Sequence, residues 1–115
     1  MNVLIIVNDP AYGTEKAYNA FRLASFLQKS ELKVRIFLMA DAVICALKNQ
    51  KTPEGYYNLG RMLKGILKRD GEVRACGVCM TARGIAKDRL LNSVKPSNMA
   101  ELADWVKTSE KIVTF

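Results

Sequence analysis

Two cysteines are the residues of this sequence whose type and spacing could do chemistry. Cys76 and Cys79 form a Cys-Gly-Val-Cys segment that follows a short predicted strand and precedes residues 80–86, which could open a helix. Backbone N–H groups and the dipole at a helix start stabilise a thiolate, the nucleophilic form of cysteine. Arg83 adds a positive charge nearby in the sequence. The pattern predicts a thiol of lowered pKa that can carry a thiolate or a persulfide.

Other uses of the same spacing stay open or are disfavoured. A closed zinc site needs four ligands, but the chain offers one further cysteine, Cys45, and no histidine, so we expect neither a metal nor an organic cofactor. A dithiol redox role remains open, although in thioredoxin-type proteins such a motif ordinarily opens the helix of a βαβ unit, whereas here it follows the third predicted strand. The pair could also simply pack as small apolar residues, which is what we expect of Cys45.

Composition narrows the remaining chemistry. The absence of histidine excludes His-based triads and HExxH zinc sites. Eighteen Lys and Arg against eleven Asp and Glu give a charge of +7, which favours anionic partners. Because these cations are scattered, we expect a solvated basic surface and no direct binding of nucleic acid. The longest apolar run, residues 42–47, is too short to span a membrane. Three cysteines without a secretory signal indicate reduced thiols, so we expect a cytoplasmic protein.

The elements that must position the cysteines alternate between strand and helix. A β-branched run at residues 3–7 predicts a strand buried on both faces, and apolar residues at helical spacing follow through about Lys29. Further strands are predicted at residues 33–39, 72–75, 93–95 and 111–115, and further helices at 42–47, 59–67 and after Asn98.

Particular residues are expected to begin and end these elements. Asp41 is predicted to cap the helix over 42–47, Gly71 to end the helix that starts at Leu59, and Pro96 to end the fourth strand. Asn98 with Glu101 resembles a capping box. The buried stripe of this last helix is predicted to be Met99, Leu102, Ala103 and Val106.

This alternation predicts one domain over residues 1–115, a flavodoxin-like three-layer α/β sandwich. Its mainly parallel sheet of about five strands should carry helices on both faces. Reactive groups in such sheets gather beyond the carboxyl ends of the strands, so we expect the first loop, with Tyr12, Gly13 and Thr14, to neighbour the cysteine segment. That loop lacks the nucleotide-binding glycine patterns, and a tight turn with Thr14 as N-cap is favoured over a ligand cradle.

Five segments in this order resemble the DsrE/DsrF-like family, most closely its small YchN-type branch, which is related to the TusD-type sulfur-relay subunits. The resemblance covers the chain from end to end. The segments are NDPAYGTEKAYNAFRLA, FLMADAV, LKNQKTPEGYYNLGRML, CGVCMTARGI and ELADWVKTSEKIVTF.

The resemblance implies a flavodoxin-like subunit that assembles as a homo-oligomer, a trimer or hexamer, and exchanges sulfur with donor and acceptor proteins. In the relay branch the working cysteine lies eight residues before the glycine of an Arg-Gly pair. The same count back from Gly84 falls on Cys76. Arg83 matches the basic residue of that pair, Tyr12 and Gly13 match the loop after the first strand, and the second cysteine, Cys79, departs from the relay pattern.

A sulfur-relay protein that accepts and passes on sulfane sulfur as a persulfide is therefore the function we expect. The alternatives are a non-catalytic oligomeric scaffold or binding module, and a dithiol redox protein. The helix over 42–47, apolar all round, independently suggests that a further copy covers it.

Overall fold

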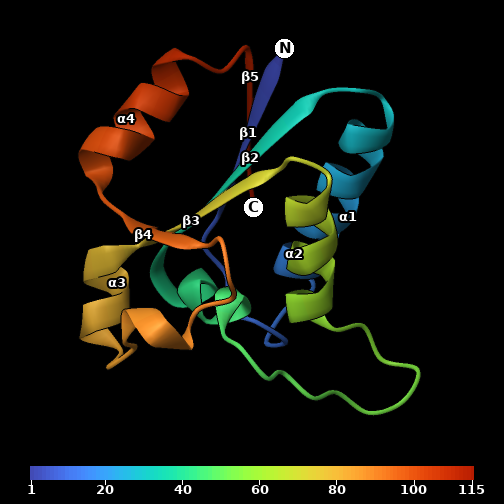
Figure 1. Ribbon diagram of the computed structural model, residues 1–115, viewed down its shortest axis with the longest axis vertical. Coiled ribbons are helices and arrows are strands. Elements are labelled where there is room, and N and C mark those ends of the chain that lie inside the picture. Colours follow the sequence, from blue (N-terminus) through green and yellow to red (C-terminus); the bar gives the residue numbers. More distant parts are fainter.

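The computed structural model describes residues 1–115 and places a five-stranded, all-parallel sheet at the centre of the molecule (Figure 1). The strands run in the order β4-β3-β2-β1-β5. Their bounds are β1 Asn2–Val7, β2 Lys33–Leu38, β3 Glu72–Cys76, β4 Lys95–Ser97 and β5 Lys111–Thr114. The helices are α1 Lys16–Lys29, α2 Leu59–Lys68, α3 Gly77–Ala82 and α4 Met99–Lys107, with 3-10 turns at η1 Ala40–Ala46 and η2 Lys87–Arg89.

Helices α1 and α2 cover one face of the sheet, where most of the core lies (Figure 1). Alternate residues of β1, including Val3, Ile5 and Val7, point into this core with Phe21 of α1 and Leu63 of α2. Side chains alternate between the faces of a strand, so Leu4 of β1 belongs to the opposite layer. The strand is thus buried on both faces, as its continuous apolar run predicts.

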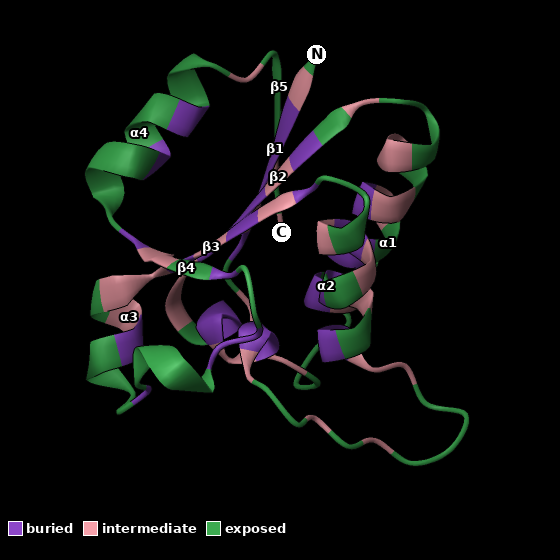
Figure 2. Cartoon of the chain, in the orientation of Figure 1, coloured by how far each residue is buried: buried purple, intermediate pink, exposed green.

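The other face is covered by α4, and its core is small. It consists of four buried residues: Leu4, Phe37, Leu102 and Trp105. The Trp105 ring meets Phe37 edge-on at 6.1 Å between centroids. The predicted stripe of α4 was wrong except at Leu102, because Met99, Ala103 and Val106 are exposed and Trp105 is buried in their place (Figure 2).

The segment over 40–46 departs from the prediction in two ways. It is a 3-10 helix whose N-cap position is Met39, and Asp41 makes no capping bond. Its residues Ala42, Val43, Cys45 and Ala46 are fully buried within the single chain. The chain itself therefore covers this apolar helix, and the argument that it asks for cover from another copy was wrong.

The end of α2 and the end of β4 differ from the predicted positions. The left-handed residue after α2 is Asp70, at φ +64°, and not Gly71. Gly71 is needed for space instead, because a Cβ there would lie 2.5 Å from Cγ2 of Ile66. Pro96 lies inside β4 rather than ending it, as an edge strand allows because its outer N–H positions need no partner.

Layers of helices on both faces of a parallel sheet confirm the predicted flavodoxin-like three-layer architecture. No helix is long and apolar enough to span a membrane.

Candidate functional site

Cys76 ends β3 and occupies the N-cap position of α3. Its Sγ accepts a hydrogen bond from the backbone N–H of Cys79 at 3.3 Å. The helix therefore begins at Gly77, immediately after the first cysteine. A Cβ at Gly77 would lie 3.2 Å from the carbonyl oxygen of Ser97, so the glycine lets the start of α3 approach β4 closely. Together these features place the two thiols at the carboxyl edge of the sheet.

Cys79 meets the segment that follows β2. The backbone N–H of Ala40 donates to Cys79 Sγ at 3.2 Å. Ala40 has φ +51°, a left-handed conformation that residues other than glycine rarely adopt. Both Cys76 and Cys79 are free cysteines of intermediate exposure, and each sulfur accepts a hydrogen bond from a backbone N–H.

Arg83 links α3 to the same segment. Its Nε donates to Asp41 Oδ1 at 2.8 Å, and its Nη1 donates to the carbonyl oxygen of Cys79 at 3.0 Å. The carboxylate of Asp41 balances the charge of the Arg83 guanidinium. Both hydrogen bonds of the guanidinium go to oxygen atoms and neither goes to a cysteine sulfur.

Gly84 ends α3 in a left-handed conformation at φ +66°. Its N–H donates to the carbonyl of Thr81 at 3.1 Å, and the N–H of Ile85 donates to that of Met80 at 3.0 Å. This is the hydrogen-bond pattern of a Schellman ending, in which glycine is favoured. The Arg-Gly pair thus combines a link to Asp41 with a helix stop.

The electrostatics of Cys76 differ from the expectation. Burial raises the pKa of the Cys76 thiol above its ordinary value, and a side-chain hydrogen bond with Cys79 raises it further. Backbone N–H bonds from Cys79 and Val78 oppose these effects without overcoming them. The predicted lowering of the pKa at Cys76 is therefore corrected: at neutral pH this thiol is protonated.

Arg74, which precedes Cys76 by two residues, directs its charge away from the cysteines. Its Nη1 lies 3.9 Å from Oε1 of Glu101, and its guanidinium lies 4.3 Å above the Trp105 ring. Arg83 and Arg74 are thus each paired with a carboxylate, Asp41 and Glu101 respectively.

Cys45 is not accessible to reagents in solvent. It is fully buried in η1, and burial raises its pKa to about 12. Its role is to pack in the core, as predicted.

The predicted residues of the first loop do not join the cysteines. β2 lies between β1 and β3, so the loops that follow β1 and β3 are not direct neighbours. The hydroxyl of Tyr12 donates to Gln50 at 2.6 Å and accepts from the N–H of Leu59 at 3.0 Å. The expected adjacency was wrong, and Tyr12 instead fastens the segment over 49–58 to the start of α2.

Gly13 and Thr14 complete this turn. A Cβ at Gly13 would lie 3.0 Å from Cγ of Pro10. Thr14 Oγ1 donates to Asp9 at 3.0 Å and accepts from the N–H of Lys16 at 3.3 Å. The hydroxyl satisfies a free N–H at the start of α1, close to the predicted capping role, although the N-cap position itself is Glu15.

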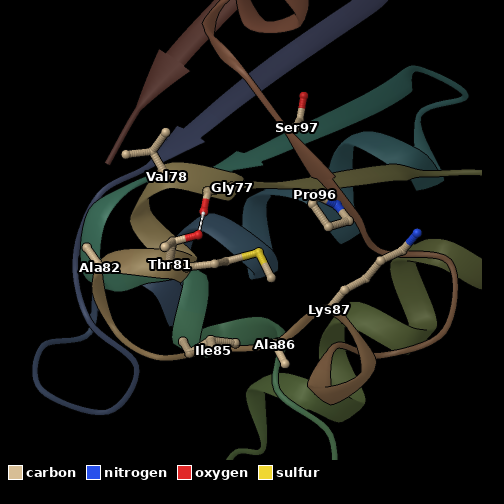
Figure 3. Close-up of a pocket in the computed structure, with 10 residues that line it drawn as sticks. Gly77, Val78, Thr81, Ala82, Ile85, Ala86, Lys87, Pro96 and Ser97 are labelled. Carbon is tan, nitrogen blue, oxygen red and sulfur yellow. Dashed lines mark hydrogen bonds between the residues drawn. The ribbon is translucent and has the colours of Figure 1, made fainter.

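An open cavity of about 790 Å³ lies between α3 and β4 (Figure 3). Val78 and Ala82 of α3 border it on one side, and Pro96 and Lys87 on the other. Thr81 donates to the Gly77 carbonyl at 3.1 Å within this wall. Neither Cys76 nor Cys79 lines this cavity, so the two thiols do not lie inside it.

Ala40 and Asp41 are the site residues that sequence reasoning missed. Asp41 was interpreted as a helix cap, and an alanine carries no chemical signal. Their place could have been found from topology, because β2 and β3 pair in parallel and the segments after them meet at one sheet edge. No group of three or more His, Cys, Asp or Glu residues comes together to hold a metal ion.

The fold and the paired thiols define a flavodoxin-like α/β protein with two free cysteines at the carboxyl edge of its sheet. The chain belongs to the DsrE/DsrF-like family, whose model matches residues 1–115. Protein YchN of Escherichia coli K12 is 38% identical over 115 residues, covering 98% of this chain and 97% of that protein. Sulfurtransferase TusD of Buchnera aphidicola subsp. Acyrthosiphon pisum is more distant, at 30% identity over 129 residues with both chains fully covered.

Solved structures of other proteins share this fold. The crystal structure of the YchN protein from Escherichia coli superposes with a TM-score of 0.94 at 37% identity, covering 99% of this chain and 98% of that chain. A protein of unknown function from Methanobacterium thermoautotrophicum has a TM-score of 0.75 at 12% identity, which shows the shared fold alone.

Proposed function

We propose that this protein is a sulfur carrier that accepts sulfane sulfur as a persulfide on the Cys76–Cys79 segment and passes it to an acceptor thiol. The observation that carries the proposal is the pair of free, partly exposed cysteines joined by the Cys79 N–H to Cys76 Sγ bond at the sheet edge. Family membership supports it, since a relative is named as a sulfurtransferase.

Within this pair, Cys76 corresponds to the working cysteine of the relay pattern and Cys79 is its partner. Transfer is thiol exchange: a thiolate attacks the outer sulfur of a donor persulfide, and the donor thiolate leaves. No metal or organic cofactor takes part in this exchange. Because the pKa of Cys76 is raised, the passage of sulfur through Cys76 should become faster as the pH rises above neutral.

The partners that fit this chemistry are proteins that bring and remove sulfur in the cytoplasm, together with further copies of this chain in a trimer or hexamer. Val78, between the two cysteines, is 80% exposed, so an apolar side chain is free for contact beside the thiols. Sizing in solution tests the assembly, and a monomer at micromolar concentration would contradict it.

The carrier role is tested by incubating the reduced protein with a low-molecular-weight persulfide and mapping its peptides by mass spectrometry. The peptide with Cys76 and Cys79 should gain about 32 Da, one sulfur atom, and lose it on addition of a dithiol. Cys45→Ser is the matched control, because Cys45 is buried and should leave uptake unchanged. Label on neither Cys76 nor Cys79 would reject the proposal.

A dithiol redox role is the second candidate, and the two free cysteines joined by the Cys79 N–H to Cys76 Sγ bond favour it. Mild oxidation followed by mass analysis separates the two functions. A redox protein should lose about 2 Da on forming a reversible disulfide and release added sulfur as hydrosulfide, whereas a carrier should retain it.

A further inference from the structure

The contact between Ala40 and Cys79 carries an inference about the order in which the two cysteines act, and this inference rests on the proposed function. We propose that Cys79, whose Sγ accepts a hydrogen bond from the backbone N–H of Ala40, attacks the sulfur donor first, and that Cys76 then takes the sulfur from Cys79.

The first observation is the strained donor. Ala40 has φ +51°, and its N–H donates to Cys79 Sγ at 3.2 Å. Such a conformation persists in a residue other than glycine only where its surroundings hold it, and it clusters at functional sites. A backbone N–H bond is stronger to an anionic acceptor than to a neutral one, so this donor can support the Cys79 sulfur while it acts as the attacking nucleophile.

The second observation is the clamp around that donor. Asp41, next to Ala40, accepts from Arg83 Nε at 2.8 Å, and Arg83 Nη1 also donates to the Cys79 carbonyl at 3.0 Å. The guanidinium thus ties the segment after β2 to the residue that carries the sulfur. Arg83 acts here as a positioning residue rather than as a counter-ion.

The third observation concerns the partner thiol. Burial and the bond with Cys79 raise the pKa of Cys76, so Cys76 keeps its proton at neutral pH. The groups that face Cys79 are therefore the Ala40 N–H, the Cys76 thiol, and the Arg83 guanidinium neutralised by Asp41. The donor to the Cys79 sulfur is the Ala40 N–H, whereas the Cys76 sulfur accepts from the N–H of Cys79.

The two steps balance without an oxidant or a reductant. In the first, Cys79 S⁻ attacks the outer sulfur of a donor R–S–SH, the Cys79–sulfur bond forms, the donor S–S bond breaks, and R–S⁻ leaves. In the second, Cys76 attacks the outer sulfur of the Cys79 persulfide, its proton moves to the departing Cys79 sulfur, and the products are a Cys76 persulfide and a Cys79 thiol.

Limited alkylation tests the order. The reduced protein is treated at pH 7 with substoichiometric iodoacetamide, and the first adduct is located by peptide mass mapping. We expect it on Cys79. Cys76→Ser should keep the fast phase and Cys79→Ser should lose it. A first adduct on Cys76, or a fast phase that survives in Cys79→Ser, would overturn the proposed order.

A second readout follows the donor itself. In two-dimensional NMR spectra, the Ala40 amide resonance should shift when Cys79 is alkylated, and this shift should be absent in Cys79→Ser. An Ala40 amide resonance that does not move when Cys79 is alkylated would contradict the assignment. Asp41→Ala should slow alkylation of Cys79 by about two- to fivefold, the range for an exposed ion pair. Asp104→Ala, which removes an exposed acid on α4, is the matched control and should change nothing.

Persulfide loading of the same variants separates this inference from the proposed function. Sulfur that enters Cys76 at full rate in Cys79→Ser would refute the order while the carrier role stands. Sulfur that enters neither cysteine in the unmodified protein would refute the carrier role itself.

Discussion

Alkaline pH should destabilise the protein through Cys45, the cysteine that packs in the core. Burial raises the pKa of this thiol from 9.0 to about 12. A group whose pKa is raised by folding contributes stability that is fully present below its ordinary pKa and lost as the pH rises through the folded value. For Cys45 the loss therefore begins near pH 9 and ends near pH 12.

The size of the loss follows from the shift. Each pKa unit corresponds to about 1.4 kcal/mol, so the whole shift is worth about 4 kcal/mol. At pH 10.5 the thiol is ionised in most unfolded chains and protonated in the folded one, which costs about 2 kcal/mol of unfolding free energy.

Urea unfolding under reducing conditions at pH 7 and pH 10.5 measures this loss. Cys45→Ala removes the ionisable thiol, and Val43→Ala, another buried truncation in η1, keeps it. The drop between the two pH values should be about 2 kcal/mol larger for the natural protein and Val43→Ala than for Cys45→Ala. An equal drop in all three proteins would refute the assignment of Cys45 as a buried, un-ionised thiol.

Three further substitutions test the elements around the site. Gly84→Ala should cost about 1–2 kcal/mol of unfolding free energy in urea, because φ +66° strains a side chain that meets no atom within 4 Å; an unchanged stability would contradict this origin. Trp105→Ala should cost about 3–5 kcal/mol, since it removes the largest side chain of the small core under α4, and a loss below about 1 kcal/mol would show that α4 is held by other contacts. Tyr12→Phe should cost about 1 kcal/mol of unfolding free energy and speed hydrogen exchange at the Leu59 amide, because the Leu59 N–H donates to the Tyr12 hydroxyl. An unaffected exchange rate would argue against that bond.

The fold was predictable because its signals are local and repeated. The continuous β-branched run of β1 and the spacing of Leu59, Met62 and Leu63 each specify one element, and alternation of strand and helix restricts the topology. The stripe of α4 was mispredicted because a short helix of nine residues with Trp105 on one side offers two faces of similar hydrophobicity, and only packing against Phe37 decides between them.

The site was predictable in its residues but not in its electrostatics. The spacing of Cys76 and Cys79 singles out the pair, and the Arg-Gly pair marks the end of α3. The pairing of Arg83 with Asp41 joins residues 42 positions apart, so it depends on the order of strands rather than on local sequence. The same holds for Ala40, whose contribution is a backbone conformation that no side chain signals.

The proposed carrier takes up one sulfane sulfur on the Cys76–Cys79 segment and gives it back to a thiol. A single-turnover experiment with ³⁵S-labelled persulfide, in which the label is followed from donor to protein to acceptor, tests this transfer. We expect a transient label on the cysteine-pair peptide that then appears in the acceptor, and no transfer in the double variant Cys76→Ser, Cys79→Ser. Transfer at the same rate in the double variant, or label that never enters that peptide, would contradict it.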